Sequence, residues 1–408
     1  MAHGVVIVGA SIAGYNVAKE LRTKGYQGKI TLVGKQANLP YDLKELSKNW
    51  MLAQETVSPP VFRDETFYED EKITLKLGTE IVSIDPENHT VQTNKKESIP
   101  YDQLVLAIGS TLRMFNAPGV DAEGIFYLRD FENAQKIKAW DKKSKDIVIV
   151  GAGFIGLEMA STFAQVGLNV TVIEHAPLPL GRIVGEEASH YFSNMHRSHG
   201  VTLLTSEDVT AFEKNKQGHV TVALTASGKK INCQMVIIGI GVVPNTSIAH
   251  PDLEVQRGIV VNEYGETSLP DVYAAGDCTV WPYQGELVHV EHWEHARAHG
   301  RCVAHNIIQP KSEVYATRPY FWTDEYDQTF EYLGHTLTWN QTVTRGSSDE
   351  PKFTIAYLDE NRRPLGVLFA NNAEKRADIA ALMDKNLPIN LDRFKDPTIS
   401  ILETTESS

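Results

Sequence analysis

Residues 145–160 read KDIVIVGAGFIGLEMA, a short apolar run that leads into a glycine-rich turn and then an amphipathic stretch. A similar order, GVVIVGASIAGYNVA, occupies residues 4–18. Each is followed by a second apolar run, NVTVIE and KITLVG respectively, so each predicts a strand–turn–helix–strand unit. Such βαβ units imply parallel sheets. We therefore expect an α/β protein with two Rossmann-like dinucleotide-binding domains.

The rest of the chain extends this organisation. YDQLVLAIGS (101–110), MVIIGIGVVPN (235–245) and LPDVYAAGDC (269–278) each predict a buried strand that ends in a turn. From about Arg318 the pattern changes to that of antiparallel strands and a helix, which indicates a C-terminal α+β domain. The predicted boundaries are 1–112 with 246–318 for the first, discontinuous domain, 113–245 for the second, and 319–408 for the third.

Composition narrows the function classes. The chain has 408 residues and a formal charge of −13, which argues against generic nucleic-acid binding. Its apolar runs are shorter than the about 20 residues that span a bilayer. The first strand starts close to Met1, so we expect no signal peptide and a cytoplasmic protein. The three cysteines show no CxxC pair or metal-ligand spacing, so we expect neither disulfides nor a metal site.

The second glycine-rich turn has the features that a pyrophosphate requires. Gly151, Gly153 and Gly156 complete the GxGxxG pattern, which offers backbone N–H groups at the positive end of a helix. Glu174 ends the following strand, where an acid can accept both ribose hydroxyls. The acid favours NADH, because it would repel the 2′-phosphate of NADPH; only His175 could weaken this preference.

The first turn departs from the pattern. Ser11 replaces the middle glycine between Gly9 and Gly14, and Lys35 occupies the position expected for the ribose acid. A lone glycine-rich turn can be a tight βα connection without a ligand. Two such turns, both in βαβ context, make that alternative less favourable.

Several short segments in order along the chain resemble one family. They are LPYDLKELSK (39–48), GAGFIGLE (151–158), LPDVYAAGDC (269–278), VEHWEHARAHG (290–300), FWTD (321–324) and PKFTIAYL (351–358). On these segments the chain resembles the flavin-dependent NADH:ferredoxin reductases of oxygenase systems, the putidaredoxin reductase-like flavoproteins. The resemblance covers essentially the whole chain.

The resemblance implies that the first unit binds FAD and the second NADH. It implies electron transfer to a small [2Fe–2S] ferredoxin or a rubredoxin that feeds an oxygenase, by a monomer or homodimer. The implied FAD-binding residues are Gly9, Ser11, Ile12, Ala13, Gly14, Lys35, Lys48, Ala107, Gly109, Arg113, Asp277, Glu291, His292 and Trp293. The implied NADH-binding residues are Gly151, Gly153, Phe154, Ile155, Gly156, Glu158, Glu174, Arg182 and Gly241.

Lys48 and Glu158 are the candidate catalytic residues. By resemblance they lie together beside the flavin N5 atom, where a hydride arrives; the plain alternatives are a solvated lysine and a helix-surface glutamate. Asp277 is expected at a strand-to-helix turn, where its carboxylate accepts ribityl hydroxyls and the helix start faces the flavin; the alternative is a simple N-cap. Trp293 is expected to stack on the flavin edge or to be a core tryptophan.

Two departures and one absence qualify the resemblance. Leu43 stands where the family has an arginine, and Lys44-Glu45 replace a Pro-Pro pair. No cysteine precedes Cys233, so a thiolate relay is not expected, and Cys278 is expected to be a buried residue. Two alternative functions stay open: an NADH oxidase or quinone reductase, and a redox signalling flavoprotein like apoptosis-inducing factor.

Overall fold

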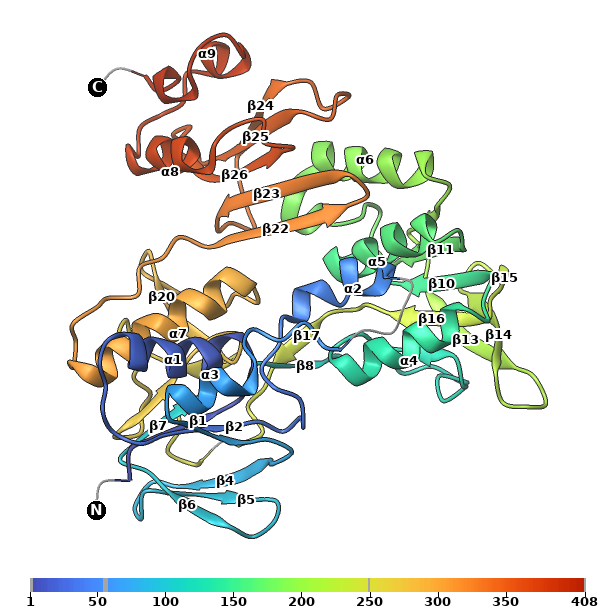
Figure 1. Ribbon diagram of the computed structural model, residues 1–408. Coiled ribbons are helices and arrows are strands. Elements are labelled where there is room, and N and C mark those ends of the chain that lie inside the picture. The colour runs from blue at the N-terminus through green and yellow to red at the C-terminus, as the bar shows by residue number, and fades with distance from the viewer. Residues whose placement is uncertain (1–2, 54–57, 249, 407–408) are drawn as a thin grey trace. The chain divides into compact units, whose positions relative to one another are not determined.

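Two parallel sheets organise the chain, one in each of two units (Figure 1). The computed structural model describes residues 3–53, 58–248 and 250–406. The first unit comprises Met1–Lys44, Ser58–Leu112 and Val242–Pro319, and the second comprises Glu45–Val57, Arg113–Gly241 and Tyr320–Ser408. The α/β fold class expected from the two glycine-rich stretches is confirmed.

The first unit is built on a five-stranded parallel sheet in the order β19-β7-β1-β2-β3. Its strands are β1 (Val5–Val8), β2 (Ile30–Val33), β3 (Ile73–Lys76), β7 (Gln103–Leu106) and β19 (Val272–Ala274). Its helices are α1 (Ile12–Thr23), α3 (Glu65–Asp70) and α7 (Trp293–Ile308). All four residues of β1 are buried, as expected for a central strand with covered faces.

Smaller sheets complete the first unit. An antiparallel sheet β4-β5-β6 and a mixed sheet β18-β20-β21 each have three strands, and β8 pairs with β17. The bounds are β4 (Ile81–Asp85), β5 (Thr90–Thr93), β6 (Ser98–Pro100), β8 (Ser110–Leu112), β17 (Val242–Pro244), β18 (Ile259–Val260), β20 (Thr279–Tyr283) and β21 (Glu286–Val288). A short 3₁₀ turn covers Leu43–Glu45.

The second unit repeats the plan of the first. Its parallel sheet has the order β12-β11-β10-β16-β9, and an antiparallel sheet β13-β14-β15 follows. The strands are β9 (Ile125–Phe126), β10 (Asp146–Val150), β11 (Asn169–Glu174), β12 (Thr202–Thr205), β13 (Val209–Lys214), β14 (Val220–Thr225), β15 (Lys230–Asn232) and β16 (Met235–Ile238). The helices are α2 (Asn49–Leu52), α4 (Phe131–Asp141), α5 (Phe154–Gln165) and α6 (Gly181–Ser198).

The C-terminal part of the second unit is a five-stranded antiparallel sheet with helices, as its strand pattern predicted. The order is β22-β23-β26-β25-β24. The bounds are β22 (Tyr320–Glu325), β23 (Gln328–Gly334), β24 (Gln341–Gly346), β25 (Phe353–Leu358), β26 (Pro364–Ala370), α8 (Arg376–Asp384), α9 (Leu391–Lys395) and the 3₁₀ turn Ile401–Glu403. Strand β24 and helix α9 were not predicted from the sequence.

The prediction of a helix beginning at Asp277 is wrong. Asp277 lies in a turn between β19 and β20, and the chain continues as a strand. The residues that follow, Thr279–Tyr283, include β-branched and aromatic side chains that favour a strand. The hydroxyl of Thr279 donates to the carbonyl oxygen of Gly276 at 2.8 Å and closes the turn. Asp277 is therefore not a helix N-cap either.

Candidate functional site

The second glycine-rich turn joins β10 to α5 without any spare space at its first and third glycines. Gly151 has a φ of +101°, and its N–H donates to the carbonyl oxygen of Ile173. A Cβ at Gly156 would lie 2.1 Å from the carbonyl oxygen of Gly151, so the helix packs directly on the turn. These two glycines are required by the protein's own packing.

The middle glycine, Gly153, is different. It caps the N-terminus of α5 without a side-chain hydrogen bond, and a Cβ there would meet no protein atom within 4 Å. Nothing in the fold demands a glycine at this position, but close approach of a phosphate would. Phe154 and Ile155 form the first helical turn, whose N–H groups have no intrahelical partner. The turn therefore fits a bound pyrophosphate.

Glu174 ends β11 beside this turn, as the sequence predicted. Its carboxylate accepts hydrogen bonds from the N–H groups of Ala152 (2.6 Å) and Ala176 (2.8 Å). These bonds fix the acid next to the glycine-rich turn, where it can receive ribose hydroxyls. The neighbouring His175 is exposed and pairs with Asp208 at 2.9 Å, so it does not bring an uncompensated positive charge to this edge.

The two remaining NADH candidates lie farther along the chain. Arg182 is an exposed residue in the first turn of α6. Gly241 follows β16 with a φ of +94°, and a Cβ added there would meet no protein atom within 4 Å, so its backbone lies open. Nothing among the described residues links either of them to the glycine-rich turn, and their roles stay predictions.

The first turn has the same backbone frame. Gly9 has a φ of +113°, and a Cβ there would lie 2.0 Å from the carbonyl oxygen of Ala107. A Cβ at Gly14 would lie 1.9 Å from the carbonyl oxygen of Gly9. Ser11 is the N-cap of α1, yet its side chain makes no capping hydrogen bond. The N–H groups at the start of α1, a segment that includes Ile12 and Ala13, are thus uncapped as in α5, and the turn fits a phosphate too.

Other FAD candidates gather at the same end of the first parallel sheet. Ala107 and Gly109 follow β7, which lies between β1 and β19 in the sheet. Asp277 follows β19, and its carboxylate accepts a hydrogen bond of 3.3 Å from the Ser110 hydroxyl. Because the carboxyl ends of parallel strands share one edge, the strand order places these residues and Gly9 together.

Two predicted residues do not join that group. Lys35 follows β2 and forms an exposed ion pair of 2.8 Å with Glu80. Arg113 follows β8 as an exposed residue, and its N–H donates to the carbonyl oxygen of Gly241. Neither contact points to a phosphate or a ribose, so both assignments stay predictions.

The segment that precedes α7 holds the next candidates. Glu291 pairs with His289 at 3.0 Å, His292 is the N-cap of α7, and Trp293 is its first residue. The indole N–H of Trp293 donates to Asp42 at 3.0 Å. Lys44 lies 5.0 Å from the centre of the Trp293 ring and also pairs with Asp42. The half-buried tryptophan is therefore anchored to the 39–44 segment and is not a core residue.

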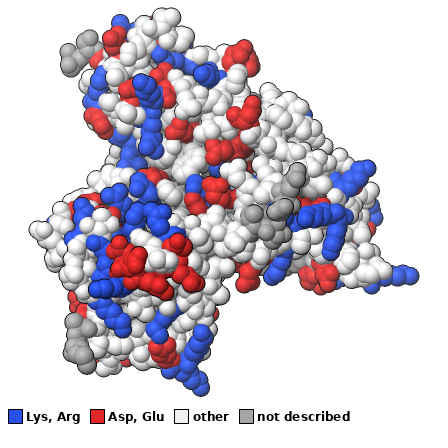
Figure 2. All heavy atoms as spheres, viewed as in Figure 1, with Lys and Arg blue, Asp and Glu red and all other residues white. Residues whose placement is uncertain are grey.

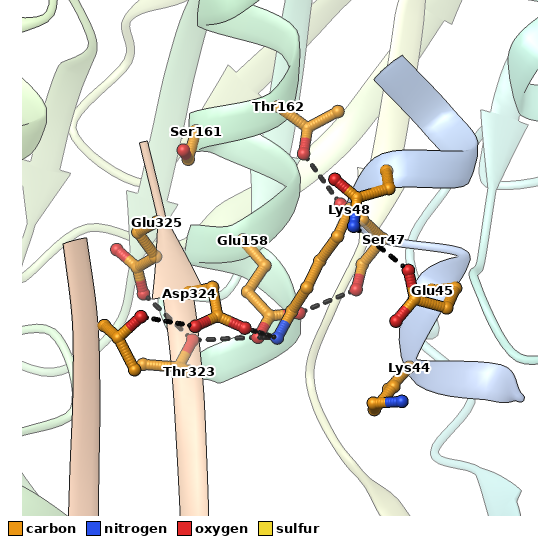
Figure 3. A network of polar contacts seen from close by, with 12 residues as sticks. Lys44, Glu45, Ser47, Lys48, Glu158, Ser161, Thr162, Thr323, Asp324 and Glu325 are labelled. Atoms are coloured by element: carbon orange, nitrogen blue, oxygen red, sulfur yellow. Dashed lines mark hydrogen bonds and ion pairs between the residues drawn. The ribbon is translucent and has the colours of Figure 1, made fainter. Parts of the chain in front are cut away.

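Lys48 and Glu158 meet in the second unit, within a buried polar network (Figure 3). The Lys48 Nζ lies 3.2 Å from Oε1 of Glu158 and 2.8 Å from Oδ2 of Asp324. Glu158 also accepts hydrogen bonds from the hydroxyls of Ser47 (2.6 Å) and Thr323 (2.8 Å). The two plain alternatives, a solvated lysine and a helix-surface glutamate, are therefore wrong: Lys48 keeps 13% of its side chain exposed and Glu158 keeps 7%.

Burial and charge act on this pair in opposite ways. Burial opposes the charge on Lys48, but the carboxylates of Glu158 and Asp324 outweigh it and raise the Lys48 pKa. Burial is the largest influence on Glu158 and raises its pKa, and the Lys48 ammonium offsets only part of this. The network thus holds a firmly protonated lysine beside a carboxyl group that gains a proton more easily than usual.

Three members of this network were not predicted: Ser47, Thr323 and Asp324. They lie within segments that carried the resemblance, LPYDLKELSK and FWTD, so a signal was present in the sequence. It could not be read as a contact, because the segments are far apart along the chain. Only the fold brings β22 alongside α5 and the Lys48 segment.

The cysteines have no role in the site. All three are free and buried. Burial raises the pKa of Cys278 to about 12, which removes the thiolate that redox chemistry needs.

Within residues 3–53, 58–248 and 250–406, no group of three or more His, Cys, Asp or Glu side chains could hold a metal ion. No helix in the described part of the chain is both long and apolar enough to cross a membrane.

Two family models match this chain. The model of the pyridine nucleotide-disulphide oxidoreductase family matches residues 3–300, and that of the reductase C-terminal domain matches residues 320–405. Rhodocoxin reductase from Rhodococcus erythropolis is 33% identical over 96% of this chain and 92% of its own.

Two solved structures are similar over nearly their whole length. The ferredoxin reductase for the CYP199A2 system from Rhodopseudomonas palustris has a TM-score of 0.92 and 31% identity, and the match covers 99% of this chain and 100% of that one. The reductase in a covalent putidaredoxin reductase–putidaredoxin complex has a TM-score of 0.93 and 30% identity, covering 98% and 97%.

Proposed function

We propose, from the premise that this chain belongs to the pyridine nucleotide-disulphide oxidoreductase family, that it is an FAD-dependent NADH:ferredoxin reductase. Electrons pass from NADH through FAD to a small [2Fe–2S] ferredoxin or a rubredoxin, which feeds an oxygenase. The observation that carries this proposal is the pair of glycine-rich turns on parallel sheets, with Glu174 fixed beside the second. The relatives are named reductases of such electron carriers.

Each part of the chain has a distinct role in this proposal. Residues 1–112 and 246–318 bind FAD, residues 113–245 bind NADH, and residues 319–408 form the C-terminal domain. Gly153 and the first turn of α5 hold the NADH pyrophosphate, and Glu174 binds its ribose. Gly9, Gly14 and the start of α1 hold the FAD pyrophosphate, and Asp277 accepts ribityl hydroxyls. Bound FAD supplies the chemistry that converts a two-electron hydride donor into a one-electron source.

Lys48 and Glu158 position the reacting groups. A buried ion pair is costly unless each partner is satisfied, and this one is satisfied by Asp324, Ser47 and Thr323. The Lys48 ammonium supplies a fixed positive charge, since its raised pKa keeps it protonated across the physiological range. The adjacent Glu158 carboxyl group can hold or release a proton.

The acceptor is a protein that takes single electrons and no hydride. Because the three cysteines are buried and the Cys278 thiol has a raised pKa, no thiol of this chain would serve as an intermediate electron carrier. Figure 2 shows Lys and Arg side chains interspersed with Asp and Glu on the visible face, so the net charge of −13 does not make that face uniformly acidic. Local basic groups there are available to an acidic carrier. We also propose that the protein works in the cytoplasm.

The experiment that tests this function is NADH-driven cytochrome c reduction by the purified protein, with and without an added [2Fe–2S] ferredoxin. A rate that rises at least tenfold with the ferredoxin supports the proposal. The variant Cys278→Ala should keep the full rate, since no step uses that thiol. Rapid NADH consumption in air that ignores the ferredoxin would contradict the proposal and assign the protein as an NADH oxidase.

A further inference from the structure

A second buried acid–base pair lies next to the Lys48–Glu158 network and has no part in the proposed function. Oε2 of Glu325 lies 2.7 Å from Nε2 of His196, and neither side chain has any exposed surface. Glu325 is the last residue of β22, and His196 lies near the end of α6. Burying both groups of such a pair costs desolvation free energy, and a function for the pair would explain why the protein keeps it.

The Thr323 hydroxyl connects this pair to Glu158. Its Oγ1 lies 2.8 Å from Oε1 of Glu158 and 3.4 Å from Oε1 of Glu325. A hydroxyl group has one proton to donate and two lone pairs that accept. It can therefore donate to one carboxyl group while it accepts from the other, and Thr323 itself is fully buried.

The other end of the chain of contacts reaches the surface. The Tyr326 hydroxyl lies 3.0 Å from Nδ1 of His196, and the Tyr326 ring stacks on exposed His199 at 3.7 Å. Tyr326 has a φ of +58°, which is unfavourable for a non-glycine residue. Its N–H donates to the Ser161 hydroxyl at 2.6 Å, which holds it in this conformation and keeps the phenol on His196.

We propose that His196, Glu325 and Thr323 form a buried relay that carries one proton between the surface at Tyr326 and the carboxyl group of Glu158. They are positioning residues, because they act through Glu158. This inference rests on the proposed function, in which Glu158 is part of the site. Figure 3 shows Thr323 and Glu325 on one strand, with Glu158 on the facing helix.

The proposed reaction requires such a path. Oxidation of one NADH by two one-electron carriers yields NAD⁺, two reduced carriers and one proton. The carriers take only electrons, so that proton has to return to water in every turnover. In the outward direction, Glu158 takes up the proton that NADH oxidation releases and gives a proton to Thr323, whose own proton passes to Oε1 of Glu325. The proton on Oε2 of Glu325 passes to Nε2 of His196, and the Nδ1 proton leaves by way of Tyr326.

Each relay member gains one proton and loses one, so the net transfer is from Glu158 to water. The proton of Glu325 then lies on Oε1 and that of His196 on Nε2, and both groups have to return to their starting forms before the next turnover. Transfer in this direction starts with Glu325 protonated on Oε2 and His196 protonated on Nδ1. In the described part of the chain, the other charged or titratable groups that face the relay are Lys48 and Asp324 beside Glu158, and His199 beside Tyr326. Burial raises the pKa of Glu158, which favours proton exchange at this carboxyl group.

Thr323→Val tests the relay, because valine keeps the shape and removes the linking hydroxyl. The matched control is Thr354→Val, since Thr354 is equally buried in the same sheet and its hydroxyl has no hydrogen-bond partner among the described residues. NADH is mixed with the holoenzyme and ferricyanide, and a pH-indicator dye follows proton release. We expect release to lag electron transfer at least tenfold in Thr323→Val and to keep pace with it in wild type and Thr354→Val.

A second measurement uses the resting protein and no NADH. The nitrogen shifts of His196 are recorded by NMR at one pH, with His196→Gln to assign the signal. Glu158→Gln should change these shifts, because the amide replaces a carboxyl group that is linked through Thr323 to Glu325, the partner of His196. Glu325→Gln replaces Thr323→Val if that variant does not fold.

Unchanged His196 nitrogen shifts in Glu158→Gln, or proton release in step with electrons in the relay variant, would overturn the inference. Ferricyanide replaces the ferredoxin here, so failure to reduce ferredoxin would count against the proposed function and leave this result standing.

Discussion

The two glycine-rich turns share one backbone frame and differ at two positions. In both, the first glycine has a positive φ, and a Cβ at the third would collide with the carbonyl oxygen of the first, at 1.9 Å in the Gly9 turn and 2.1 Å in the Gly151 turn. The middle position is Ser11 in one turn and Gly153 in the other. The strand that follows ends near Lys35 in the first and at Glu174 in the second.

This difference separates what a fold requires from what a ligand requires. The outer glycines of each turn are dictated by contacts inside the protein, so they would be needed even without a ligand. At Gly153 a Cβ would meet no described protein atom within 4 Å, so internal packing does not require a glycine there. We therefore propose that the middle glycine and the acid serve the ligand, whereas the outer glycines serve the fold.

The largest expected effect comes from substitutions that disrupt the backbone of the glycine-rich turns. Gly156→Ala and Gly14→Ala each force a Cβ against a backbone carbonyl oxygen that cannot move without the turn. We expect each to lower the free energy of unfolding by about 3 kcal/mol, as overpacking of a close-packed contact does. Gly153→Ala should cost less than about 1 kcal/mol, the loss of a weak N-cap. Urea unfolding of the three variants measures these values.

Gly153→Ala should instead act on the ligand. We expect its dissociation constant for NADH to rise about tenfold, which corresponds to about 1.4 kcal/mol. Equal losses of stability at the outer and middle glycines would show that the middle glycine is also structural, and the distinction between the two kinds of position would fail.

The same distinction explains how much the sequence could predict. The βαβ units, their parallel sheets and the C-terminal hairpins follow from local periodicity and turn residues, and the structure has them. Asp277 was misplaced because a glycine–aspartate turn after a buried strand is compatible with either a helix or a strand. The following Thr279–Tyr283 segment contains β-branched and aromatic side chains, which favour a strand over a helix.

Contacts between segments that lie far apart along the chain could not be predicted from local sequence patterns. Lys48 and Glu158 were paired from the resemblance, but Asp324, Ser47 and Thr323 complete the pair only because β22 packs against α5. Lys44 stands where the resemblance leads us to expect a proline. Its side chain pairs with Asp42 and lies 5.0 Å from the centre of the Trp293 ring, and neither contact could be predicted from the local sequence.

The second prediction concerns low pH, which should lower the stability of the first unit because that unit contains buried histidines. His299 and His295 are fully buried on α7, and the Gly276 N–H donates to Nδ1 of His299 beside Asp277. Burial lowers the pKa of His299 to about 3. Between that value and the unfolded value near 6.5 the unfolded chain binds more protons, so stability is complete above pH 6.5 and falls as the pH drops.

From pH 7 to pH 5 we expect His299 alone to account for a loss of about 2 kcal/mol. His299→Gln should flatten that part of the stability profile, measured by urea unfolding at both pH values. His190→Gln is the control, because His190 is an exposed residue and should keep the wild-type slope. If wild type and His299→Gln lose the same free energy between the two pH values, the buried imidazole is not the acid-sensitive group.

The smallest expected effect concerns the residues that follow the two turns. Glu174→Gln keeps the shape of the side chain and removes the negative charge that would repel the 2′-phosphate of NADPH. We expect the ratio of kcat/KM for NADH to that for NADPH to fall about tenfold, or about 1.4 kcal/mol. Lys35→Gln, at the corresponding place after the first turn, should leave this ratio unchanged, because Lys35 belongs to the other unit and pairs with Glu80.

Measuring the NADH-to-NADPH ratio of kcat/KM and the bound FAD in both variants makes the comparison quantitative. A Lys35 variant that loses FAD would show that this lysine replaces the missing ribose acid of the first turn. A Glu174 variant with an unchanged ratio would mean that its carboxylate serves only the N–H groups of Ala152 and Ala176. The acid after the second turn would then be a structural residue like the outer glycines, and Gly153 alone would mark the dinucleotide site.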